Sequence, residues 1–204
     1  ITSWISETDN GQSDAINKGF RMAKGSILAW LNSDDMYYPN AVEEAVSNLL
    51  DNPQAGLVYG DTKLIDELGH EIGQFNARQT DYYRLMGGYV DVPQPSAFWR
   101  AKLWNVVGPV DETFNYAMDY DLWVRLARVT EIRYVPHYWA NFRLHGDAKT
   151  IAADERCWPE MLKIHKRNGG GYFSWIYARY ITRRILSPWI NSRRKKLFEK
   201  SVRE

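Results

Sequence analysis

The feature that most limits the fold is a short apolar segment, residues 26–31, which stops at the adjacent carboxylates Asp34 and Asp35. Before it, apolar side chains recur at helical spacing over residues 11–23, and Gly25 follows as a helix-ending glycine. A helix followed by a mostly apolar strand is typical of an α/β layer fold. Ligands of such sheets gather at the carboxyl ends of strands, so the position of the two aspartates is as informative as their chemistry.

Helical and strand patterns continue to alternate along the chain, which favours a mixed sheet flanked by helices over a sandwich or a bundle. Asn40 and Glu43 have the spacing of a capping box at the start of a helix. We expect helices at residues 40–50, 80–86 and 118–128, and strands at residues 56–59, 62–65, 71–75, 96–99, 133–135 and 138–144.

Charge is distributed unevenly along the 204 residues. The formal net charge is +1, but residues 1–170 carry −6 and residues 171–204 carry +7, and three consecutive glycines end at the change. We therefore expect a globular domain over residues 1–168 and a separate basic, amphipathic helical segment over residues 172–204. Cys157 is the only cysteine, which indicates a reducing compartment, and no 18 apolar residues occur together.

Aromatic and aliphatic residues alternate with arginines in the segment 172–204, a composition that suits a helix lying on an anionic membrane. The alternative is a helix that packs its apolar side on the domain and leaves its cations in water. Nucleic acid is not expected as a partner, because the globular part is acidic and contains no nucleic-acid-binding motif. We expect a cytoplasmic protein, with peripheral contact at the cytoplasmic face of the membrane.

The pair Asp34 and Asp35 favours a divalent metal, because adjacent carboxylates repel each other unless a cation lies between them. Oxygen ligands indicate Mg²⁺ or Mn²⁺ rather than zinc, with open positions for diphosphate oxygens. The alternative is a turn shaped by acidic side chains. His145 follows a predicted strand, in a loop where its imidazole could reach a metal or a phosphate.

Asp119 lies on the apolar side of its predicted helix, which is unusual for a carboxylate, although a first-turn aspartate is often only a cap or a dipole partner. Asp121 is four residues before Arg125, a spacing that a surface ion pair explains. Asp9, Asn17 and Lys18 flank or lie on the first helix, where exposed polar groups are ordinary.

Three segments, residues 7–19, 29–35 and 118–123, closely resemble glycosyltransferase family 2 in order and spacing. Shorter likenesses occur at residues 58–61, 94–100 and 143–150. The resemblance implies a GT-A fold, a Rossmann-like mixed sheet with flanking helices, and inverting transfer of a sugar from a nucleotide-diphosphate donor to a hydroxyl of a carbohydrate or glycolipid acceptor.

In the resemblance, Asp34 and Asp35 match the metal motif of the family, with Asp35 as the metal ligand and Asp34 as a helper on the donor. Asp119 matches the aspartate that takes the acceptor proton, although Met118 stands where the family often has glutamate. An inverting displacement needs a base on one side of the sugar and a stabilised diphosphate on the other. The resemblance also implies further contacts with the donor from Asp9, Asn17 and Lys18, with the acceptor from Gln94, Trp99 and Asp121, and with the metal from His145.

Relatives begin with two strands that hold the nucleotide base, whereas this sequence starts after both. We therefore expect an N-terminally incomplete domain. A carbohydrate-binding or scaffold module without catalysis is the alternative function, and a hydrolase using the same carboxylates is a third.

Overall fold

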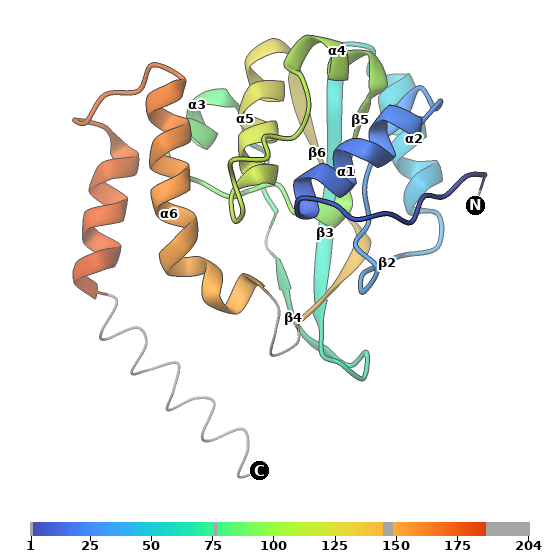
Figure 1. Cartoon of the computed structure of the whole chain (residues 1–204), viewed down its shortest axis with the longest axis horizontal. Helices are drawn as coiled ribbons and strands as arrows, with labels where there is room; N and C mark the ends of the chain where they lie inside the picture. Colours follow the sequence, from blue (N-terminus) through green and yellow to red (C-terminus); the bar gives the residue numbers. More distant parts are fainter. Residues whose placement is uncertain (1, 76, 145–148, 187–204) are drawn as a thin grey trace.

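The computed structural model describes residues 2–75, 77–144 and 149–186, over which helices and strands alternate (Figure 1). The α-helices are α1 (Gln12–Met22), α2 (Ala41–Asp51), α3 (Tyr82–Met86), α4 (Trp104–Val107), α5 (Met118–Val129) and α6 (Lys149–Arg167), followed by a helix over residues 175–186. The strands are β1 (Ile27–Leu28), β2 (Met36–Tyr37), β3 (Ala55–Ile65), β4 (Glu71–Phe75), β5 (Ala97–Arg100) and β6 (Glu131–Arg143). The 3-10 helices η1 (Gln94–Ser96) and η2 (Ala101–Leu103) flank β5.

The described strands form one mixed sheet in the order β1-β5-β3-β6-β2, with β4 paired to β3. β3 and β6 run parallel, and the other pairs are antiparallel. Parallel neighbours require a crossover connection, and α5 is the last helix of that connection, because it ends immediately before β6. The N-terminal end of α5 therefore lies beside the sheet, near the acidic loop between β1 and β2, to which Gln12 and Ser13 of α1 connect it.

Alternate residues of the central strands face opposite layers, as the two-residue period of a strand requires. Leu57 and Tyr59 of β3 belong to one buried cluster with Trp99 of β5. Val58 and Phe98, one residue along on the same strands, belong to a second cluster with the buried face of α2. The sheet is thus covered by α5 on one face and by α2 on the other.

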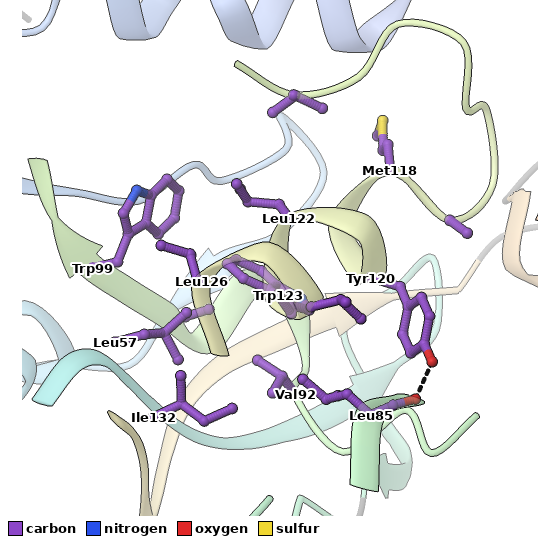
Figure 2. Packing of buried hydrophobic residues seen from close by; sticks show 14 of the residues in the cluster. Leu57, Leu85, Val92, Trp99, Met118, Tyr120, Leu122, Trp123, Leu126 and Ile132 are labelled. Carbon is purple, nitrogen blue, oxygen red and sulfur yellow. Dashed lines mark hydrogen bonds between the residues drawn. The ribbon is translucent and has the colours of Figure 1, made fainter. Parts of the chain in front are cut away.

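The larger cluster centres on α5, as Figure 2 shows. Leu122, Trp123 and Leu126 are at most 1% exposed and belong to this cluster. The indole ring of Trp123 stacks on that of Trp30, with ring centroids 5.6 Å apart. The hydroxyl of Tyr120 donates to the Leu85 carbonyl and ties α5 to α3. These contacts hold the first turn of α5 in a defined position.

Most of the expected elements are confirmed, but four of the expected strands are joined into two. Residues 56–59 and 62–65 belong to the single strand β3, and residues 133–135 and 138–144 belong to β6, which ends at Arg143. The expected hairpin is present as the antiparallel pair β3 and β4. The helices expected at residues 11–23 and 118–128 agree with α1 and α5 to within one residue at each end.

Pro136 does not divide β6, because it falls within an irregularity of the pairing between β3 and β6. The register of the two strands changes at Gly60, between Tyr59 and Asp61. A Cβ atom on Gly60 would lie 2.6 Å from the carbonyl oxygen of His137. The absence of a side chain therefore lets the two strands come close at the irregularity.

Two expectations near the aspartate pair are wrong in detail. The strand expected at residues 26–31 is only β1, because the chain then leaves the sheet and the Trp30 carbonyl accepts a hydrogen bond from Gln94 Nε2 at 2.7 Å instead of a ladder bond. Asn40 does not form a capping box with Glu43, since it has a left-handed backbone, φ 68°, and no side-chain cap hydrogen bond.

The helix over residues 175–186 runs beside α6 (Figure 1). Ile176 is fully buried in the same cluster as Trp158 and Ile164 of α6. Other apolar side chains of this region are exposed: Tyr172, Phe173, Trp175, Ile181, Ile185 and Leu186. Packing on the domain, the alternative considered from the sequence, thus holds for one side of the helix. The part of the chain that the structure describes has no helix that is both long and apolar enough to cross a membrane.

Candidate active site

The loop between β1 and β2 is organised by the side chain of Asn32. Its amide nitrogen donates to Asp35 Oδ2 at 3.0 Å and to Gln94 Oε1 at 3.2 Å, and its oxygen accepts from Gln12 Nε2 at 3.1 Å. The Asp35 backbone N–H also donates to the Asn32 carbonyl at 3.1 Å, which closes the turn. One asparagine therefore joins the first turn of α1, the acidic loop and η1.

Asp35 is bound by the protein at both of its oxygens. It is 6% exposed, and its Oδ1 accepts from the backbone N–H of Arg143, at the end of β6, at 3.0 Å. Burial raises the pKa of the Asp35 carboxyl, against the hydrogen bonds from Arg143 and Asn32, and the charge of Asp34 raises it further. The carboxylate that the resemblance made the main metal ligand is thus a buried hydrogen-bond acceptor of the loop.

The guanidinium of Arg143 secures the same loop from the outside. It donates to the Asp34 carbonyl at 3.1 Å, to the Asp66 carbonyl at 2.7 Å and to the Glu67 carbonyl at 3.0 Å. The Asp34 side chain, in contrast to that of Asp35, is partly exposed. The two neighbouring aspartates are therefore not equivalent, since Asp35 is buried and Asp34 is partly exposed.

Asp119 lies in the first turn of α5, and its Oδ1 accepts from the Tyr120 backbone N–H at 2.8 Å. Burial raises the pKa of the Asp119 carboxyl to about 6; the hydrogen bond from Tyr120 opposes this rise, and the charge of Glu160 adds to it. A carboxyl with a pKa close to neutrality can accept and release a proton at physiological pH, as a general base must.

The first turn of α1 connects the acidic loop to the first turn of α5. Gln12 contacts Asn32, as described above, and the hydroxyl of the next residue, Ser13, donates to Met118 Sδ at 2.9 Å. Met118, which immediately precedes Asp119, is 8% exposed. Segments around residues 12, 32, 94 and 118 thus meet in space, although they are separated in the sequence.

Glu160 of α6 is a further acidic residue at this place. Its carboxylate accepts from the backbone N–H groups of Asn115 at 3.0 Å and of Tyr116 and Ala117 at 2.8 Å each. Met118 is uncharged, so the neighbouring carboxylate that raises the pKa of Asp119 is Glu160 of α6. The sequence contains no signal for this, since a glutamate on a helix is ordinary, and roles for Gln12, Asn32 and Arg143 were also not predicted.

The three polar residues expected to contact the donor, before or on the first helix, each have contacts within the protein. Asn17 is 1% exposed and exchanges hydrogen bonds with the Val110 backbone, N–H to Oδ1 and Nδ2 to carbonyl, both at 2.9 Å. Lys18 Nζ pairs with Glu7 at 2.9 Å and with Asp14 at 3.2 Å. The amide of Asn17 is used inside the protein, which argues against a donor contact, and that role stays a prediction.

Asp9 is exposed and accepts from the Gly11 backbone N–H at 2.9 Å, which shapes the entry into α1. Neither Asp9 nor Lys18 is joined to the acidic loop by a hydrogen bond found in the described residues. Their contact with a donor stays a prediction.

Two of the three residues expected on the acceptor side are buried. Trp99 is fully buried between Phe20, Trp30 and Trp123. Asp121 is 1% exposed and accepts from Arg125 Nε at 2.8 Å, so the pair is buried and is not the surface pair expected. Helical and strand periodicity turns both side chains into the core, which argues against contact with an acceptor, and such contact stays a prediction. Gln94 remains at the acidic loop.

The metal site can be tested only in part. In residues 2–75, 77–144 and 149–186, no three His, Cys, Asp or Glu side chains form a group that could hold a metal ion, and His145 lies outside these residues. Mg²⁺ is commonly bound by one or two carboxylates, with water and substrate phosphates completing its shell. The oxygen donors of Asp34 and Asp35 fit Mg²⁺ or Mn²⁺ in that open arrangement and do not resemble a zinc site.

A family model described as glycosyl transferase family 2 matches residues 4–100. A glycosyltransferase of Rickettsia felis is 29% identical over 167 residues, which is 76% of this chain and 27% of that protein. A chondroitin synthase of Escherichia coli is 26% identical, over 72% of this chain and 21% of that protein. A hyaluronan synthase of Pasteurella multocida is 24% identical, over 80% of this chain and 16% of that protein. The chain spans 24% to 49% of the length of the Rickettsia relatives.

Among solved structures, S. aureus TarS 1–349 in complex with UDP-GlcNAc has a TM-score of 0.59 and 14% identity, covering 80% of this chain and 48% of that one. The mannosyltransferase PcManGT from Pyrobaculum calidifontis, in complex with GDP-Man and Mn²⁺, has a TM-score of 0.55 and 17% identity, covering 84% and 49%. These likenesses confirm the expected GT-A-like fold, of which this chain contains a part.

Proposed function

Because residues 4–100 belong to glycosyl transferase family 2, we propose that this chain is part of a metal-dependent glycosyltransferase that moves a sugar, with inversion, from a nucleotide-diphosphate donor to a hydroxyl acceptor. The observation that carries the proposal is the chain of contacts from Asp35 through Asn32, Gln12 and Ser13 to Met118. It places a carboxylate loop and a carboxylate of raised pKa around the first turn of one helix.

In this proposal Asp34 would hold Mg²⁺ or Mn²⁺. When bound, such an ion supplies positive charge that stabilises the departing diphosphate. Asp35 keeps the loop in shape through Asn32 and Arg143, so that Asp34 faces the donor. A Mn²⁺ ion is present in the PcManGT complex, which supports this choice of metal. The proposal also includes Asp35 as a second metal ligand and His145 as a third.

Asp119 would act as the general base. It accepts the proton of the acceptor hydroxyl as the hydroxyl oxygen attacks the sugar carbon that bears the diphosphate. The partly buried setting of Asp119 excludes some water and raises its proton affinity to a useful range. Gln94, beside Asn32, would contact the bound substrates from η1.

The donor class is supported by neighbours whose complexes contain UDP-GlcNAc and GDP-Man. The acceptor class is supported by relatives named chondroitin synthase and hyaluronan synthase, which favour a carbohydrate acceptor, and a glycolipid would offer the same hydroxyl chemistry. The particular sugar and nucleotide are left open by these names.

Calorimetry with UDP-GlcNAc and GDP-Man, each with and without Mn²⁺, tests the donor site in this chain. Transfer of labelled sugar to a chondroitin or hyaluronan oligosaccharide tests the reaction. We expect Asp119→Asn to bind donor with the parent's affinity and to lose transfer by a factor of about 10² or more. Asp51→Asn, an exposed aspartate on α2, is the matched control.

Transfer by Asp119→Asn at the parent rate would remove the base assignment. Failure of the parent chain to bind either donor would favour the alternative function, a carbohydrate-binding or scaffold module. Free sugar released without acceptor would favour a hydrolase.

We propose in addition that residues 172–204 contact the anionic cytoplasmic face of a membrane. The described part of this segment, residues 172–186, contains Arg179, Arg183 and Arg184 and no acidic residue, and six of its large apolar side chains are exposed. Apolar and aromatic side chains mixed with arginine suit the interface of an anionic leaflet, where each cation contributes about 1 kcal/mol.

Sedimentation with vesicles tests this contact. We expect the chain to pellet with vesicles of 30% phosphatidylglycerol in phosphatidylcholine, and much less with phosphatidylcholine alone. The double variant Ile181→Ser, Ile185→Ser should lose binding, whereas Leu50→Ser, Val106→Ser, which changes side chains of similar exposure elsewhere, should keep it. Equal binding by both double variants, or self-association through this helix in light scattering, would contradict the membrane proposal.

A further inference from the structure

Helix α5 begins without a cap of its own. Its N-cap residue is Ala117, which has no side chain able to accept a hydrogen bond, and within the first turn Asp119 accepts from the Tyr120 N–H. Glu160 accepts hydrogen bonds from the backbone N–H groups of the three residues just before the helix, Asn115, Tyr116 and Ala117. A single carboxylate, 43 residues away from Ala117 in the sequence, orders the turn from which Asp119 projects.

The place of Glu160 has an electrostatic consequence. The N-terminal end of a helix carries partial positive charge, which favours an ionised carboxylate nearby. At α5 this end is already paired with the negative charge of Glu160, so the helix end is less able to stabilise the negative charge of Asp119. The Glu160 charge also raises the pKa of Asp119 directly, beyond the effect of burial.

The other titratable groups on the described part of α6 do not cancel this charge. Burial, Asp119 and Glu160 together raise the pKa of the Cys157 thiol to about 12, so the thiol stays neutral. The guanidinium of Arg156 donates to the Tyr116 hydroxyl at 2.7 Å, and Lys163 and Arg167 lie over the ring of Phe114. Of these groups, only Glu160 acts on the Asp119 charge.

We propose that Glu160 is a positioning residue for Asp119: it orders the first turn of α5 and places its negative charge beside the base. The inference rests on the proposed role of Asp119 in transfer. It assigns Glu160 two separable effects, one from its hydrogen bonds and one from its charge. Glu160→Gln removes the charge and keeps the size of the side chain, and Glu160→Asp keeps the charge on a shorter side chain.

The direct test is a carbon NMR titration of the chain labelled at aspartate carboxyls, with the Asp119 signal assigned by its loss in Asp119→Asn. In Glu160→Gln we expect the Asp119 titration midpoint to fall by roughly half a pH unit, the size expected for one charge near the protein surface. Glu160→Asp should leave the midpoint close to that of the parent. Glu43→Gln, which removes an exposed carboxylate on α2, is the control for total charge.

The second readout is the pH profile of kcat/KM. Its acid limb should move to lower pH in Glu160→Gln by the same amount as the NMR midpoint. An unchanged midpoint in a folded Glu160→Gln chain would overturn the inference, and so would an equal shift in Glu43→Gln.

The titration requires no activity, which separates this inference from the proposed function. If Asp119→Asn keeps full transfer while the midpoint shifts, the base assignment fails and the coupling stands. If Glu160→Gln does not fold, an Asp119 midpoint in Glu160→Asp that falls as far as expected for loss of the charge would overturn the inference.

Discussion

The backbone N–H of Arg143 donates to Oδ1 of Asp35 at 3.0 Å, joining residues 108 positions apart. This bond connects the end of β6 to the acidic loop between β1 and β2. It gives the two neighbouring aspartates different environments, since Asp35 is buried inside the protein and Asp34 is partly exposed. Their substitutions should therefore separate a structural effect from an effect on metal and donor.

Asp35→Ala should destabilise the fold by about 2 kcal/mol, because it leaves the buried donors of Arg143 and Asn32 without their acceptor. Asp34→Asn should leave the unfolding midpoint within about 0.5 kcal/mol of the parent and abolish the Mn²⁺-dependent part of donor binding. Urea denaturation and calorimetry with UDP-GlcNAc, before and after chelation of the metal, measure the two effects. Equal loss of stability in both variants would contradict the division of roles.

The pH dependence of transfer should reflect Asp119. The base acts only when ionised, and its pKa is raised to about 6, so kcat/KM should fall about tenfold per pH unit below that value and level off above it. The measurement is kcat/KM from pH 5 to pH 8 with the metal kept saturating. A profile that stays level down to pH 5 would contradict the assignment.

Asp119→Asn should also be more stable than the parent above pH 6. A folded-state pKa above the unfolded value of 3.8 means that the folded state prefers the protonated carboxyl, and this preference is lost as pH rises through about 6. The asparagine variant avoids that loss, so the gain should be at most ~3 kcal/mol at pH 7.5 and close to zero at pH 3.5. Urea denaturation at both pH values measures it, and an equal effect at both would contradict the raised pKa.

Asp121→Ala should lower stability by about 3 kcal/mol without a specific effect on acceptor binding. Asp121 is 1% exposed, and its removal leaves the charge of Arg125 without its partner in a mostly buried position. We expect transfer to fall only with the folded fraction, at an unchanged KM for acceptor. A raised KM at unchanged stability would restore the acceptor role that the burial argues against.

Gly88→Ala should loosen the helix over residues 175–186. Gly88 has φ +79°, and an added Cβ would lie 2.8 Å from a side-chain carbon of Ile176, the buried residue of that helix. Gly69→Ala is the control, because Gly69 has φ +90° with open space around it. Hydrogen exchange should become faster over residues 175–186 in Gly88→Ala and stay unchanged there in Gly69→Ala.

Elements with strong local signals could be predicted from the sequence. The helix at α5 follows from the spacing of its apolar residues, and the β3–β4 hairpin follows from two strand patterns around an Asp-Glu-Leu-Gly turn. Strand joining across Pro136 could not be predicted, because the register shift that admits the proline depends on the partner strand.

In the candidate site, too, some residues could be predicted from the sequence and others could not. Asp34 and Asp119 stand out in the sequence as carboxylates at unusual positions, whereas the inward turn of Trp99 and Asp121 depends on which face of each element packs on the sheet. Asn17 has the ordinary appearance of a helix surface residue, and only its contact with Val110 reveals that it is buried.

By itself the sequence determined the layer type of the fold, the family and the two positions where acidic chemistry is concentrated, because these depend on local periodicity and on ordered motifs. The tertiary structure alone decided that Asp35 is an internal acceptor, that Asn32 joins three segments and that Glu160 holds the turn just before α5. These roles are made by hydrogen bonds between residues far apart in the chain, and the strength and partner of such a bond depend on burial and distance, which only packing sets.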